Sequence, residues 1–206
     1  MIDKISILYI DDNIDVGISN YLLNDYSKKA YTDGDRSIVK EYREIQFNNA
    51  EGYRSLLDNT CVRGSNVILV DDRLFQERDS AGKFSGTQFK ALLRKLFPFI
   101  EVVIISQFGG GSQDRIIPKF SVADGECSNL HYKRVLEPEL DKAIEEVIEF
   151  NRLTEELFTS RDVEELLIEK VRSSLQGDNS YGELTGDDVD NLVAVFNELK
   201  ASIANE

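Results

Sequence analysis

The run Val67-Ile68-Leu69-Val70, followed by Asp71 and Asp72, constrains the fold of this chain more than any other stretch. Four apolar residues, three of them β-branched, are too few for a helix. They indicate a strand that is buried on both faces, which in α/β proteins is a parallel strand. Because open parallel sheets place their sites at the carboxyl ends of their strands, the two acids predict a functional sheet edge.

The same pattern occurs at two other places in the chain. The largely apolar segment 5–10 ends on Asp11 and Asp12, and the segment 102–105 ends on Ser106. A weaker case is the segment 129–132, which would be a strand ending on Lys133. Because parallel strands share one carboxyl edge, we expect these acids, the hydroxyl and the ammonium to meet there.

Helical patterns separate the apolar runs. The expected strands lie at about 5–10, 44–47, 67–70, 101–105 and 129–132, and the expected helices at about 14–25, 50–57 and 88–97. Residues 28–43, 73–86 and 109–128 are polar or glycine-rich and are expected to be loops, the first with a turn at 32–35 and a short helix at 36–42. Alternating strands and helices predict right-handed βαβ units, and therefore an α/β fold with a parallel sheet.

The pattern changes at Glu137. Apolar residues at helical spacing predict a helix that continues to about 158, and further helices within 159–206. We therefore predict a domain over residues 1–136 that runs on into this helix, and a helical C-terminal extension over 159–206. The apolar stripes of these helices either pack on one another and on the sheet, or form a surface for a protein effector or a second copy of the chain.

The acidic charge is concentrated in this last third. Residues 1–136 hold 18 Lys and Arg against 19 Asp and Glu, a net charge of −1, whereas residues 137–206 hold 6 against 19, a net charge of −13. A chain with this balance is not expected to bind nucleic acid. No apolar run approaches the roughly 20 residues that cross a bilayer, so no membrane association is expected.

Cysteine usage is informative about the compartment. Cys61 and Cys127 are far apart and have no metal-ligand spacing, and His131 is the single histidine. The sequence starts with a predicted strand and shows no signal-peptide layout. We therefore expect reduced thiols, no zinc site and a cytoplasmic location.

The predicted sheet edge suggests phosphate chemistry. Asp11, Asp12 and Asp71 would repel one another unless a cation lay among them, and carboxylate oxygens suit Mg²⁺. An aspartate beside such an ion can accept a phosphoryl group. Lys133 would then neutralise charge on that group, and Ser106 would bind one of its oxygens.

These residues, in this order and strand context, resemble the receiver domain of two-component response regulators over residues 4–136. The resemblance implies a doubly wound, flavodoxin-like sheet of five parallel strands in the order 2-1-3-4-5. It implies that Asp71 is the phosphoacceptor, and that Asp11, Asp12, Asp71 and the backbone carbonyl of Arg73 bind Mg²⁺. It also implies Ser106 as the switch hydroxyl and Lys133 as the phosphate-pairing ammonium.

The implied function is that of a cytoplasmic signalling protein rather than a turnover enzyme. A histidine kinase or phosphotransfer protein would phosphorylate Asp71, and the change would be relayed to a protein effector or to the helical tail. The sequence departs from the family at Gln107, Leu130 and Arg134, where a small residue, an aromatic residue and a proline are usual. One alternative is therefore a receiver-like scaffold that binds partners irrespective of phosphate. Another is a Mg²⁺-dependent phosphohydrolase, although that would need an acid at position 73, where the chain has arginine.

Overall fold

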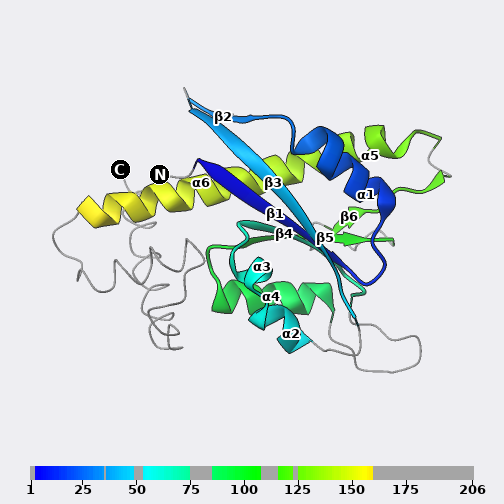
Figure 1. Ribbon diagram of the computed structural model, residues 1–206, viewed down its shortest axis with the longest axis horizontal. Coiled ribbons are helices and arrows are strands. Elements are labelled where there is room, and N and C mark those ends of the chain that lie inside the picture. Colours follow the sequence, from blue (N-terminus) through cyan, green and yellow to red (C-terminus); the bar gives the residue numbers. More distant parts are fainter. Residues whose placement is uncertain are drawn as a thin grey trace. The chain divides into compact units, whose positions relative to one another are not determined.

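A six-stranded sheet forms the centre of the computed structural model (Figure 1). The structure describes residues 3–34, 36–48, 53–74, 85–107, 116–122 and 125–159, all within one compact unit. The strands are β1 (Lys4–Asp11), β2 (Tyr31–Asp33), β3 (Arg36–Gln46), β4 (Val67–Asp71), β5 (Glu101–Ser106) and β6 (Ile116–Pro118). The predicted α/β class is confirmed, and the sheet is mostly rather than wholly parallel.

The strand order is β2-β3-β1-β4-β5-β6, which differs from the predicted five-stranded order. Strand β2 is an additional edge strand that pairs antiparallel with β3, while the other neighbours pair in parallel. Gly34, at a φ of +59°, stands in the predicted turn at 32–35 and connects β2 to β3. The segment expected to be a loop with a short helix at 36–42 is therefore a β-hairpin, and residues 44–46 are only the end of the longer strand β3.

Helices cover both faces of the sheet (Figure 1). One layer consists of α1 (Val16–Tyr21), the π-helical turn η1 (Leu22–Tyr26), α5 (Ser128–Val135) and α6 (Glu137–Thr159). The other consists of α2 (Tyr53–Asp58), α3 (Thr60–Arg63) and α4 (Gly86–Leu96). Because β4 is central, alternate residues of its fully buried run pack into each layer.

The strand predicted over 129–132 is wrong, because these residues belong to α5. Their apolar neighbours follow a helical rather than an alternating spacing. Tyr132, Leu136 and Leu140 are four residues apart, and all three are buried in the core under α1 and η1. The fifth parallel strand is instead β6, which the sequence pattern had placed in a loop.

Tyrosine side chains from the N-terminal part of the chain form hydrogen bonds with helix α6. Three phenol groups donate hydrogen bonds to acids spaced by four residues along one face of α6. The pairs are Tyr21 with Glu137, Tyr26 with Asp141, and Tyr31 with Glu145. The first part of the acidic C-terminal region is thus integral to the core unit, whereas the predicted helices of 160–206 lie outside the described residues.

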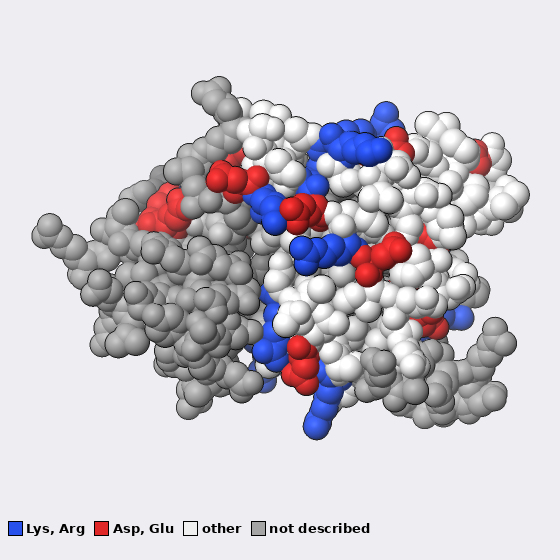
Figure 2. Space-filling view, viewed as in Figure 1, with Lys and Arg blue, Asp and Glu red and all other residues white. Residues whose placement is uncertain are grey.

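The described surface mixes the two signs of charge. On the face shown in Figure 2, Lys and Arg side chains alternate with Asp and Glu, and no continuous basic stripe is visible among the described residues. Among the described helices, none is both long and apolar enough to cross a membrane.

Candidate functional site

Three acids meet at the carboxyl edge of the sheet. Asp11 ends β1, Asp71 ends β4, and the register that pairs Ile10 with Val70 places these two acids side by side. Asp12 completes the group, with one carboxylate oxygen from each residue lying within 4.8 Å of the others. Asp11 and Asp71 are only 1% and 5% exposed, so the charges are held where water screens them poorly.

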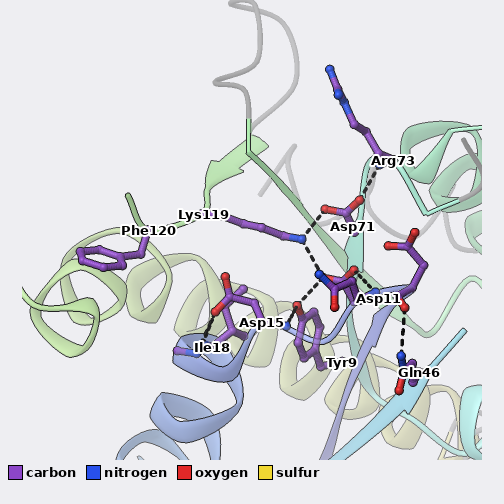
Figure 3. A network of polar contacts seen from close by, with 12 residues as sticks. Tyr9, Asp11, Asp15, Ile18, Gln46, Asp71, Arg73, Lys119 and Phe120 are labelled. Carbon is purple, nitrogen blue, oxygen red and sulfur yellow. Dashed lines mark hydrogen bonds and ion pairs between the residues drawn. The ribbon is translucent and has the colours of Figure 1, made fainter. Parts of the chain in front are cut away.

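A lysine occupies the centre of this edge (Figure 3). The Nζ of Lys119 lies 2.7 Å from Oδ2 of Asp11 and 2.8 Å from Oδ1 of Asp71. Burial alone would lower the pKa of the Lys119 ammonium, but its hydrogen bonds to the two acids outweigh burial and leave the pKa above its ordinary value. Lys119 is therefore a permanent cation that bridges two strand ends.

Further donors fix the two bridged carboxylates. The Tyr9 hydroxyl donates to Oδ2 of Asp11, and the backbone N–H of Asn13 donates to Oδ1 at 3.0 Å. The N–H of Arg73 donates to Oδ2 of Asp71 at 2.8 Å. Burial raises the pKa of the Asp71 carboxyl above its ordinary value, while the hydrogen bond and charge of Lys119 act in the opposite direction. Burial and the charge of Asp11 raise the pKa of Tyr9, so its hydroxyl remains a donor.

The lysine expected at this edge was Lys133, and this expectation is corrected. Lys133 lies in the last turn of α5 and is exposed, because the segment expected to be the fifth strand is helical. Lys119 follows the real fifth parallel strand, β6. The run Ile116-Ile117-Pro118 before Lys119 has the same form as the other strand ends, and this short run was the signal that could have identified it.

The remaining predicted site residues have the following positions. Ser106 is the buried last residue of β5, and its backbone carbonyl accepts a hydrogen bond from the N–H of Lys119 at 2.8 Å. Arg73 contributes its N–H to Asp71, and Figure 3 shows its side chain extending away from that acid. Asp72, which we did not expect to be a ligand, instead caps the first turn of α4, since its Oδ1 accepts hydrogen bonds from the N–H and hydroxyl of Thr87. Roles for Ser106 and for the Arg73 carbonyl remain predictions.

The donor set fits a divalent cation. Three carboxylates and one ammonium leave a net charge of −2, which one divalent cation would neutralise. The ligands are all hard oxygens, as Mg²⁺ prefers. Oδ2 of Asp11 already accepts from both Tyr9 and Lys119, whereas its Oδ1 and both Asp71 oxygens each have one donor among the contacts above. An ion could therefore bind through Asp12, Asp71 and Oδ1 of Asp11 without displacing Tyr9.

A hollow of about 440 Å³ opens beside the acids, lined by Asp12, Gln46, Phe47 and Asn48. It lies where the carboxyl ends of β1 and β3 adjoin, and the Gln46 amide donates to the Asp12 carbonyl at its wall. Of the three acids, Asp12 lines this hollow, whereas Asp11 and Asp71 are buried.

No protein-family model matches the chain, and no curated protein matches its sequence. One solved structure that it resembles is a two-component transcriptional regulator AraC from Clostridium phytofermentans ISDg. The two chains share 16% identity at a TM-score of 0.44, over 72% of this chain and 98% of the other. A likeness this loose gives no information about what the chain binds or does.

Proposed function

We propose that this protein is a receiver-like signalling protein that accepts a phosphoryl group on Asp71 with the aid of Mg²⁺. The observation that carries the proposal is the ammonium of Lys119 lying between Asp11 and Asp71. With the ammonium in this position, the phosphoacceptor carboxylate, a metal ligand and a fixed cation would all lie at one strand edge. The parallel strands β3, β1, β4, β5 and β6 support the resemblance to receiver domains, because they follow that family's order once β2 is set aside.

The chemistry assigns a role to each side chain. An oxygen of ionised Asp71 attacks the phosphorus of a phosphohistidine or acyl phosphate, the bond to the leaving group breaks, and an aspartyl phosphate forms. Mg²⁺, when bound to Asp11, Asp12 and Asp71, supplies charge neutralisation on the phosphoryl oxygens. Lys119 takes the role first predicted for Lys133, since its Nζ is within 2.8 Å of Asp71. The Arg73 N–H keeps the carboxylate in one orientation.

The domain and its partners are part of the same proposal. Residues 1–136 together with α6 would be the receiver-like domain, and 159–206 a helical extension that carries the output. The phosphodonor would be a histidine kinase or a phosphotransfer protein. The output would be altered docking of a protein effector.

A phosphate mimic tests the proposal directly. Beryllofluoride with Mg²⁺ is expected to shift the amide NMR spectrum of the full chain, and acetyl phosphate is expected to add one phosphoryl group detectable by mass spectrometry. Asp71→Asn should abolish both responses. Asp58→Asn is the matched control, because that acid is exposed on α2 and pairs with Arg63 at the surface.

The other outcomes discriminate between functions. No response of the wild type to either reagent would refute the phosphoacceptor role and leave a scaffold. Equal responses of the wild type and Asp71→Asn would show that the mimic binds elsewhere. Sustained turnover of a phosphate ester would instead indicate a phosphohydrolase.

A further inference from the structure

Helix α5 holds the chain on both sides of Lys119. The Nε2 of His131 donates to the carbonyl of Pro118 at 3.0 Å, and the hydroxyl of Tyr132 accepts from the N–H of Phe120 at 3.0 Å. These two neighbouring residues of α5 thus bind the residue before and the residue after the lysine. Their bonds are long-range contacts between segments that β-sheet pairing does not connect.

The backbone around Lys119 needs such support because the β-sheet hydrogen bonds between β5 and β6 end there. Strand β6 stops at Pro118, and the last ladder-type bond is the one from the Lys119 N–H to the Ser106 carbonyl. Lysine loses considerable side-chain entropy when its ammonium is fixed in one place. A backbone fixed on one side only would allow Nζ to move out of reach of the acids, since a displacement of about 1 Å already weakens a hydrogen bond of normal length.

The two anchors are themselves held rigidly. His131 is 4% exposed and Tyr132 is fully buried. The His131 ring packs edge-on against Phe120 and Tyr132, with ring centres 5.7 and 5.2 Å apart, and its Nδ1 lies 3.3 Å from Glu126. The Tyr132 hydroxyl also approaches Oδ2 of Asp15, the N-cap of α1, at 3.4 Å.

We infer that His131 and Tyr132 are positioning residues that hold Lys119 against the acids and couple the site to α5. When the ammonium moves from Asp11 and Asp71 toward a phosphoryl group, the flanking Pro118 carbonyl and Phe120 amide move with it, and α5 follows. The coupling to phosphate rests on the proposed function, whereas the positioning of the ammonium does not. Neither residue touches the reacting atoms.

The positioning is tested without phosphate or metal. Buried, ion-paired ammonium groups exchange slowly enough to give ¹H–¹⁵N signals, and the Lys119 signal is assigned by its absence in Lys119→Arg. Tyr132→Phe removes only the hydroxyl and is expected to broaden or abolish that signal. The matched control is Tyr26→Phe, which removes an equally buried hydroxyl that binds Asp141 away from the site. His131→Leu should act like Tyr132→Phe, and His131→Gln, which retains an amide donor, should restore the signal.

The coupling is tested by a double-mutant cycle. Tyr132→Phe is expected to weaken binding of Mg²⁺–beryllofluoride by about tenfold in the wild type, and by less than about twofold in Lys119→Ala. An effect that acts through the lysine disappears when the lysine is removed, whereas independent effects would add. Equal losses in both backgrounds would show that Tyr132 acts on the fold and not through Lys119. An unchanged Lys119 signal in both Tyr132→Phe and His131→Leu would overturn the inference. A lost signal in a protein that never binds beryllofluoride would support the positioning and refute only the phosphate chemistry.

Discussion

Replacing Lys119 with alanine provides the most direct test of the site. The variant leaves Asp11 and Asp71 without the cation that now lies 2.7–2.8 Å from each. The Lys119 side chain is 9% exposed, so water can replace little of the lost interaction. Removing one partner of a buried ion pair costs about 3–5 kcal/mol. We expect a loss of this size in the free energy of unfolding at neutral pH without metal.

The assay is urea unfolding followed by far-UV circular dichroism in EDTA and then in Mg²⁺. Lys133→Ala is the matched control, since this lysine is exposed on α5 and should change stability by less than about 0.5 kcal/mol. Mg²⁺ at a hundred times its dissociation constant would add about 2.7 kcal/mol. We expect Lys119→Ala to gain more from Mg²⁺ than the wild type, because the ammonium no longer competes for the carboxylates.

Two results would refute the reasoning. If Lys119→Ala were within about 0.5 kcal/mol of the wild type in EDTA, the bridge would not be a buried ion pair of consequence. If Lys133→Ala were the more damaging change, the placement of β6 and α5 would be wrong. Equal Mg²⁺ gains for Lys119→Ala and the wild type would show that the ion and the ammonium do not share ligands.

Two further substitutions test other parts of the structure. Gly86→Ala would place its Cβ 2.4 Å from the Asp71 carbonyl oxygen. We therefore expect about 1–3 kcal/mol of destabilisation in urea unfolding and weaker beryllofluoride binding in a titration. Wild-type values in both measurements would contradict the close approach. Burial and the charge of Glu146 raise the pKa of Glu101, so this carboxyl costs stability as the pH rises through its pKa. Glu146→Gln should therefore raise stability by about 0.5 kcal/mol at neutral pH and lose this advantage once both carboxyls are protonated, and a less stable variant at neutral pH in urea unfolding would count against this assignment.

The sequence predicted the central strands and their acids because these carry an unambiguous signal. β1, β4 and β5 are apolar runs buried on both faces, so few alternatives to a parallel strand exist for them. Strand pairing then brings their last residues together whatever the loops do. For this reason Asp11, Asp12 and Asp71 could be placed at one edge from the sequence alone.

The edge elements were predicted poorly for a physical reason. β3 carries lysines, arginines and glutamates along much of its length, because one of its neighbours is the short strand β2 and part of it faces solvent. β6 has three residues, too few for a periodic signal. The buried residues Tyr132 and Leu136 have helical spacing, but a run this short does not distinguish a helix from a strand by its apolar pattern alone. Because the fifth strand was predicted at 129–132, Lys133 was expected at the sheet edge, where the structure has Lys119.

The position of Lys119 has a consequence for how the site would respond to its ligands. Oδ2 of Asp11 accepts from Tyr9 and from Lys119, which fills that oxygen, and Asp71 offers Lys119 its Oδ1. A metal ion would therefore bind carboxylates whose charge Lys119 already neutralises in part. Its positive charge would weaken the electrostatic attraction between these acids and the Lys119 ammonium. Metal binding and phosphorylation would then act in the same direction, both favouring departure of Lys119 from the acids. Because His131 and Tyr132 bind the residues that flank this lysine, α5 is the described helix on which both events would converge.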